Sequence, residues 1–135
     1  MDRLIDASLW VDFTRARTPR PLREQVRAFV DAPDACLCDP VAFELLRAAA
    51  PAERPGLERR FETMYWLPLP PGFWRKGIRL GQHCRDHGFT IGALDLLIAT
   101  AALAHDAEIV TFDADYSLIA QAEPKLRVQV LTRAQ

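Results

Sequence analysis

The stretch from residue 91 to residue 116, IGALDLLIATAALAHDAEIVTFDADY, decides how this chain folds. The range Ala93–His105 is nearly all apolar and predicts a helix, with Asp95 as its acid in the first turn. Glu108–Phe112 predicts a strand that ends in Asp113. A helix that leads into a strand is the unit from which mainly parallel α/β sheets are built.

The rest of the chain repeats this alternation of strands and helices. The other predicted strands are 4–5, 35–38, 128–131 and a short one at 66–69. The other predicted helices begin near residue 8 and cover 22–30, 41–50, 57–64, 73–87 and a short segment up to 120. This order implies right-handed crossovers and an α/β fold with a mainly parallel sheet. The length of 135 residues, without repeats or linkers, predicts one domain covering residues 1–135.

Charge and cysteine content narrow the class of protein. Seventeen basic and eighteen acidic residues give a formal net charge of −1, which excludes a strongly basic nucleic-acid coat protein but allows an enzyme with a local basic rim. The odd number of cysteines, Cys36, Cys38 and Cys84, indicates a reducing compartment. There is no signal-peptide core and no membrane-spanning apolar run, so we expect a cytoplasmic protein. His83 and His87, four residues apart, indicate either a metal pair or a polar helix face.

Four acids interrupt apolar surroundings at separate places in the chain. Asp6 and Asp113 each end an apolar strand, whereas Glu44 and Asp95 each lie near the beginning of an apolar helix. Sites in open α/β sheets form beyond the carboxyl ends of the strands, so we expect these acids to converge at one rim.

Clustered carboxylates have a direct chemical consequence. They repel one another unless a cation neutralises them, and hard divalent cations such as Mg²⁺ and Mn²⁺ take all-oxygen ligand sets of this kind. Such ions hold phosphate oxygens and activate water for in-line attack on a phosphodiester. The pattern therefore favours a metal-dependent site for phosphodiester chemistry.

Each acid also has a simpler interpretation. Asp6 can cap the helix that follows it, and Glu44 can pair with Arg47 on the helix surface. Asp95 lies where the helix dipole favours an anion. Asp113 is a common turn residue. These structural interpretations stay open beside the metal site.

The four acids lie in blocks that resemble those of a known family. Residues 4–10 (LIDASLW), 41–46 (VAFELL), 91–99 (IGALDLLIA) and 109–116 (IVTFDADY) resemble, in order and spacing, the PIN-domain ribonucleases. The most specific part is the D-x-x-I-A helix followed by T-x-D-x-D and then Phe or Tyr. In its length and in the residues of these blocks, the chain is most similar to the VapC toxins of bacterial toxin–antitoxin pairs.

The resemblance implies a PIN-like α/β/α sandwich with a central, mainly parallel sheet. It also implies a Mg²⁺- or Mn²⁺-dependent endoribonuclease, in which water cleaves RNA and the cation is held by Asp6, Glu44, Asp95 and Asp113. Asp115 is implied as an accessory ligand.

The resemblance extends to neighbours of the acids. Ser8 and Thr111 match hydroxyl positions two residues from an acid, where they orient carboxylates or water. One departure is Phe112, which lies where the family frequently has Arg or Asn.

Alternative functions make different demands on the sequence. A phosphate-transfer receiver domain needs paired acids near the first strand and a Lys after a late strand, whereas Asp6 stands alone and Lys125 follows Glu123-Pro124. A haloacid-dehalogenase-type phosphatase needs a second Asp where Ser8 stands. A PIN-like module that binds RNA or protein without cutting is the third alternative, and loss of a metal ligand would be its mark.

The aromatic residues bear on binding partners. The segment Trp10-Val11-Phe13 and the pair Phe73-Trp74 predict either exposed binding surfaces or core packing, and the first segment is the better candidate for a surface. The resemblance implies a homodimer and a groove for a small antitoxin protein. We expect that inhibitor to insert Arg or Lys near Asp6 and Asp95, because a cation would neutralise the carboxylates.

Overall fold

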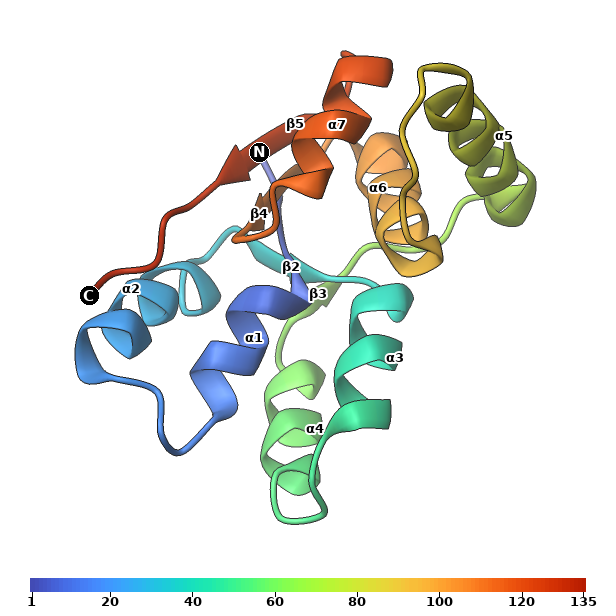
Figure 1. The fold of residues 1–135 in the computed structure, drawn as a ribbon. Helices are drawn as coiled ribbons and strands as arrows, with labels where there is room; N and C mark the ends of the chain where they lie inside the picture. Colours follow the sequence, from blue (N-terminus) through green and yellow to red (C-terminus); the bar gives the residue numbers. More distant parts are fainter.

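The computed structural model describes residues 1–135 and contains one five-stranded sheet in which every pairing is parallel. The strands are β1 (Arg3–Ile5), β2 (Ala35–Leu37), β3 (Tyr65–Trp66), β4 (Glu108–Thr111) and β5 (Arg127–Val130). Their order in the sheet is β3-β2-β1-β4-β5 (Figure 1). The chain therefore winds in one direction from β1 and in the other from β4, and the carboxyl ends of these two adjacent strands mark the point of reversal.

Seven helices cover the sheet. They are α1 (Ala7–Thr14), α2 (Arg20–Val30), α3 (Asp39–Ala48), α4 (Arg54–Glu62), α5 (Phe73–Asp86), α6 (Ala93–His105) and α7 (Asp115–Ala122). Right-handed crossovers in opposite directions place α1 to α4 on one face and α5 to α7 on the other, as Figure 1 shows. The predicted α/β/α sandwich is thus confirmed. None of the helices combines the length and apolar character needed to cross a membrane.

Several predicted boundaries were shifted by a few residues, and the shift in the third strand has a local cause. The third strand was expected at 66–69 but consists of Tyr65–Trp66, because Pro68 and Pro70 carry no N–H for pairing in a sheet. Pairing to β2 ends with the Leu67 N–H, which donates to the Leu37 carbonyl at 2.8 Å. The helix expected from residue 41 begins two residues earlier, at Asp39.

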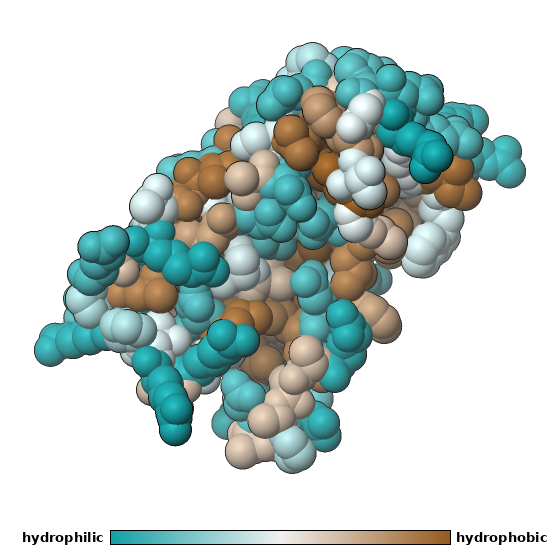
Figure 2. Space-filling model, viewed as in Figure 1, coloured by the Kyte–Doolittle hydropathy of each residue, from teal (hydrophilic) through white to brown (hydrophobic).

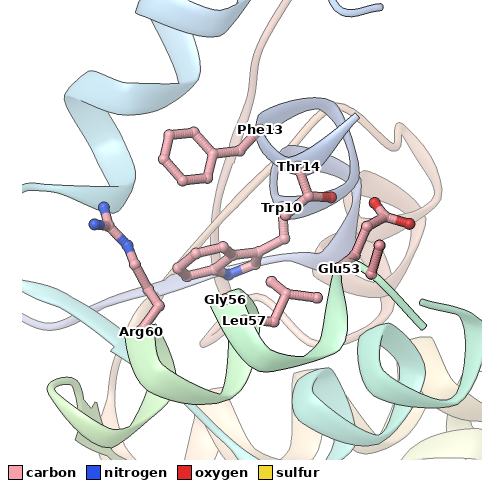
Figure 3. Close-up of a pocket in the computed structure, with 8 residues that line it drawn as sticks. Trp10, Phe13, Thr14, Glu53, Gly56, Leu57 and Arg60 are labelled. Atoms are coloured by element: carbon pink, nitrogen blue, oxygen red, sulfur yellow. The ribbon is translucent and has the colours of Figure 1, made fainter. Parts of the chain in front are cut away.

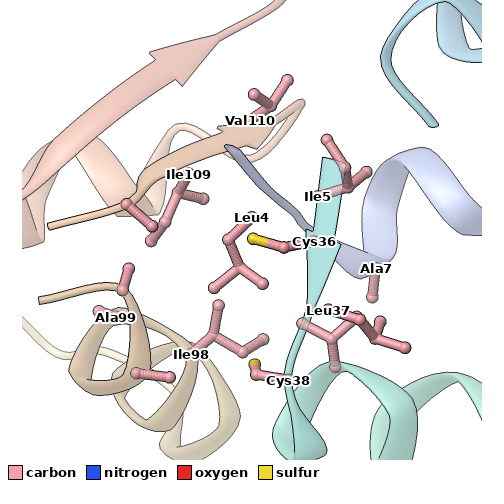
Figure 4. Packing of buried hydrophobic residues seen from close by; sticks show 14 of the residues in the cluster. Leu4, Ile5, Ala7, Cys36, Leu37, Cys38, Ile98, Ala99, Ile109 and Val110 are labelled. Atoms are coloured by element: carbon pink, nitrogen blue, oxygen red, sulfur yellow. The ribbon is translucent and has the colours of Figure 1, made fainter. Parts of the chain in front are cut away.

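The core lies between the sheet and both helical layers. Leu4, Ile5, Ile109 and Val110 are fully buried, as expected for central parallel strands covered on both faces (Figure 4). Ile98 of α6 packs among them and is also fully buried. The central strands and the helix that carries Asp95 are therefore parts of one rigid core.

The aromatic residues are not placed as predicted. Trp10, expected on a surface, has no exposed area, and it packs edge-on against Phe13 and Phe61. Trp74 is instead 68% exposed, although its neighbour Phe73 is buried. The difference arises because the Trp10 ring packs between α1 and α4, against Phe61 of α4 (Figure 3), whereas Trp74 lies on the exposed side of α5.

Candidate functional site

The candidate site lies beyond the carboxyl ends of β1 and β4. Asp6 follows β1 directly, and Asp113 comes two residues after β4 ends at Thr111. Asp6 also caps α1, since one of its carboxylate oxygens, Oδ2, accepts a hydrogen bond from the Ser8 N–H at 3.3 Å. Asp6 therefore both caps α1 and lies at the rim formed by the carboxyl ends of the strands.

Two hydroxyl groups fix the Asp6 carboxylate. Ser8 Oγ and Thr111 Oγ1 each donate to Asp6 Oδ2 at 2.8 Å. The same two hydroxyls accept backbone N–H groups, from Phe112 at 3.0 Å and from Asp113 at 2.8 Å. The turn after β4 is thereby locked to Asp6, which holds the acids of the two strands in a fixed relation.

A second group of acids joins at the same place. One carboxylate oxygen from each of Asp95, Asp113 and Asp115 lies within 4.8 Å of the others. The Asp115 N–H donates to Asp113 Oδ1 at 2.9 Å, so the turn role expected for Asp113 is also present. Asp95 reaches the group from the first turn of α6. The five acids singled out in the sequence thus include three that the structure brings within reach of one ion.

Glu44 approaches this group from α3. Burial raises the pKa of its carboxyl, and the negative charges of Asp6 and Asp95 raise it further. Its Oε2 atom is buried without any hydrogen-bond partner. The ion pair expected with Arg47 does not form, because the Arg47 guanidinium lies over the Phe43 ring at 5.9 Å.

The pKa of Asp95 is shifted by burial and by the negative charges around its carboxylate. Burial raises its pKa to about 6, and the charges of Asp6 and Asp113 act in the same direction. A hydrogen bond from Tyr116 opposes this rise. Buried oxygens that lack a donor and carboxylates that resist ionisation both fit a hard divalent cation, which would supply the missing positive charge.

Tyr116 is a site residue that sequence reasoning missed. Its side chain is fully buried, and its hydroxyl lies within hydrogen-bond distance of two carboxylate oxygens, Asp6 Oδ1 at 3.0 Å and Asp95 Oδ1 at 3.2 Å. The available signal was its place at the end of the T-x-D-x-D block, directly after Asp115.

Phe112 and the histidine pair, His83 and His87, were also singled out in the sequence. The Phe112 ring supports the Arg133 guanidinium at 4.4 Å, and Arg133 Nε donates to Asp12 Oδ2 at 2.8 Å. A cation from the carboxyl-terminal segment thus covers Phe112. Each ring of the alternative metal pair, His83 and His87, bonds instead to a backbone carbonyl, at 2.6 and 2.9 Å.

A separate hollow lies between α1 and α4. Figure 2 shows this face of the molecule indented beside α4, with hydrophobic residues on its floor. The cavity has a volume of about 360 Å³, and its lining includes Trp10, Phe13, Gly56, Leu57 and Arg60 (Figure 3). The buried Trp10 Nε1 atom has no hydrogen-bond partner.

Comparisons with known proteins agree on the family. A family model described as PIN domain matches residues 3–122. Ribonuclease VapC11 of Mycobacterium tuberculosis is 32% identical over 123 residues, which cover 87% of this chain and 91% of that protein. Ribonuclease VapC19 of the same organism is 28% identical over 109 residues, covering 81% and 86%. The structure of VapBC2 from Rickettsia felis bound to a promoter DNA fragment has a TM-score of 0.75 at 17% identity, covering 98% of this chain and 100% of that chain. This last likeness shows the fold.

Proposed function

The chain belongs to the PIN-domain family, and from this premise we propose that it is a Mg²⁺- or Mn²⁺-dependent endoribonuclease that acts as the toxin of a toxin–antitoxin pair. The observation that carries the proposal is the unpartnered, buried Glu44 Oε2 among acids at the carboxyl ends of β1 and β4. The names of two relatives, Ribonuclease VapC11 and Ribonuclease VapC19, support the ribonuclease activity.

Five carboxylates are available for the cation. We propose Asp6, Glu44, Asp95 and Asp113 as the ligands, with Asp115 as an accessory ligand. The oxygens of Asp95, Asp113 and Asp115 lie within 4.8 Å of one another, whereas Asp6 and Glu44 stand beside this group without belonging to it. These residues would hold the cation, and once bound it would polarise the phosphodiester as a Lewis acid and lower the pKa of water so that hydroxide is available as the nucleophile.

The other residues of the site hold the acids in place. Ser8 and Thr111 restrict the Asp6 carboxylate to one orientation, because both donate to the same oxygen. The Asp115 N–H holds Asp113. Since these donors are anchored in the core and in helix termini, the carboxylates need little reorganisation when substrate binds.

The test of the activity is cleavage of total RNA by the purified protein, with cleavage ends mapped by sequencing. New ends in Mn²⁺ or Mg²⁺ that disappear on chelation are the expected result. The alternative, a PIN-like module that binds RNA or protein without cutting, is supported if the protein binds RNA but generates no ends. The presence of all four acids favours cleavage.

We place the protein in the cytoplasm, as one domain of residues 1–135. Its three cysteines are buried and free, which suits a reducing compartment. The 32 buried hydrophobic residues form one continuous cluster, which supports a single domain.

A small antitoxin is the proposed protein partner. The structural neighbours from Rickettsia felis and Haemophilus influenzae are described as VapBC2 and VapBC-1, and the hollow between α1 and α4 offers apolar surface for a segment of such a partner. We also propose that the partner inserts Arg or Lys near Asp6 and Asp95. A cation there would relieve the repulsion that raises the pKa of Asp95.

Filling the hollow is expected to release the inhibitor. A Cβ atom added at Gly56 meets no atom within 4 Å, so the position has room for a side chain, and Gly56→Trp places an indole ring at the lining of the hollow. We expect antitoxin binding, measured by calorimetry, to weaken at least about tenfold, or roughly 1.4 kcal/mol. RNA cleavage by the free toxin should stay unchanged. Gly56→Ala is the matched control, and equal binding by the parent and the Trp variant would show that the partner docks elsewhere.

We propose a homodimer through the outer face of α5. Trp74 and Ile78 lie one helical turn apart and are 68% and 61% exposed. Large exposed apolar side chains in adjacent turns are typical of interaction surfaces. Together they form an apolar stripe for a second copy of the chain.

Light scattering tests this dimer. The parent is expected at about twice the chain mass of 15.2 kDa, and Trp74→Glu at the chain mass itself, because a buried charge at the contact is unfavourable. Arg85→Glu on the same helix is the control and should remain dimeric. A parent that is monomeric at tens of micromolar, roughly the range of weak homodimers, would contradict the proposal.

A further inference from the structure

One hydroxyl group, that of Tyr116, connects two acids of the site, Asp6 after β1 and Asp95 in α6. Tyr116 Oη lies 3.0 Å from Asp6 Oδ1 and 3.2 Å from Asp95 Oδ1. A phenol carries one proton and donates it to one carboxylate at a time. The same hydroxyl oxygen therefore lies between the Oδ1 atoms of the two acids.

The position of this hydroxyl is set by the core and not by the acids. The Tyr116 side chain has no exposed area. Tyr116 lies in the first turn of α7, which packs against β5 and α6. A fully buried ring in a packed interior has little freedom to move. The core therefore holds the Tyr116 hydroxyl in a fixed position beside both carboxylates.

Asp95 depends on this contact more than Asp6 does. Asp6 Oδ2 has two other hydroxyl donors, Ser8 and Thr111. The Tyr116 hydroxyl is the hydrogen-bond donor that the structure gives to Asp95. Without it, the Asp95 side chain has no protein contact that selects one orientation of its carboxylate toward Asp6.

We propose that Tyr116 is a positioning residue of the metal centre, whose hydroxyl sets the relative orientation of Asp6 and Asp95 and thereby the affinity for the divalent cation. This inference rests on the proposed function, because the cation is the one proposed there. Donors that orient metal ligands typically contribute about 10- to 100-fold to metal affinity.

The test is Mn²⁺ binding to the full chain by isothermal titration calorimetry, at a temperature where every variant is folded. Tyr116→Phe removes the hydroxyl and keeps the ring, and Phe is the alternative residue in the motif that the sequence resembles. We expect the Kd for Mn²⁺ to rise about tenfold. The Mn²⁺ concentration that gives half-maximal RNA cleavage should rise by the same factor, with a smaller change in the rate at saturating Mn²⁺.

Thr100→Val is the matched control. Thr100 is also buried, and its hydroxyl donates to the Leu96 carbonyl within α6 at 2.7 Å, so this variant loses a buried hydroxyl without touching an acid. Its Kd for Mn²⁺ should equal that of the parent. The proposal is overturned if Tyr116→Phe binds Mn²⁺ as tightly as the parent, or if Thr100→Val weakens binding equally. A parent chain that binds no Mn²⁺ overturns the proposed metal centre as well.

Discussion

Replacing Asp95 with Asn is expected to slow RNA cleavage by about 10³-fold, because removing one preorganised charge from a catalytic centre has an effect of this order. Asn keeps the size of the side chain and an oxygen that can accept the Tyr116 hydroxyl, so the variant differs in charge more than in packing. Rates are measured on one RNA at saturating Mn²⁺, with circular dichroism to confirm the fold.

The same substitution is expected to stabilise the metal-free protein at pH 7.5. The raised pKa of Asp95 means that its ionised form is unfavourable in the folded chain. Removing that charge should increase the free energy of unfolding by roughly 1 kcal/mol, since the loss of an anion from the α6 amino terminus offsets part of the gain.

Asp106→Asn is the matched control for this prediction. Asp106 follows the other end of α6 and has a φ of 51°, a backbone conformation that Asn also adopts readily. It lies at the opposite end of the helix from the acids and pairs with Arg127. We expect cleavage at the parent rate. A cleavage rate of Asp95→Asn equal to that of the parent would remove Asp95 from the proposed ligand set.

Stability is expected to depend on pH and on divalent cations together. In the folded chain Asp95 binds its proton up to a pKa of about 6, whereas the ordinary pKa of this carboxyl, which applies in the unfolded chain, is 3.8. Between these values the folded state holds more protons, so its stability decreases as pH rises. This contribution is most favourable below the lower value and is lost above pH 6. The metal-free protein should therefore melt at a lower temperature at pH 7.5 than at pH 5.

Mn²⁺ should reverse this loss at pH 7.5. A cation present at 100 times its Kd stabilises the folded state by about 2.7 kcal/mol, which raises the Tm of a chain of this size by roughly 10 °C. At pH 5 the increase should be smaller, since protons compete for Asp95. The measurement is a thermal melt with and without Mn²⁺ at both pH values.

The Asp95→Asn variant serves as the internal control for these melts. It should lose most of the Mn²⁺-dependent increase and the part of the pH dependence that Asp95 contributes. Melting curves of the parent that do not move with Mn²⁺ at pH 7.5 would contradict a metal centre at these acids.

Local sequence patterns were sufficient to predict the secondary structure and the sheet. The apolar run Ala93–His105 followed by Glu108–Thr111 marks a helix and a strand because each pattern reflects burial within one element. Alternation of such elements then leaves a parallel sheet as the expected arrangement. The position of Asp6 and Asp113 after strands likewise placed both acids at one rim. Proline spacing, not hydrophobicity, decided the length of β3.

Contacts between distant elements were decided only by the tertiary structure. Tyr116 lies 110 residues from the Asp6 carboxylate to which it donates. No periodicity in the sequence encodes that distance. The burial of Trp10 depends on Phe61 in α4, and the unpartnered Glu44 Oε2 depends on how α3 packs near α6. The sequence by itself thus determined that Asp6 and Asp113 lie at one rim, because that follows from strand direction. Helix packing decided which side-chain atoms are in contact, because contacts between distant elements depend on how the whole core packs.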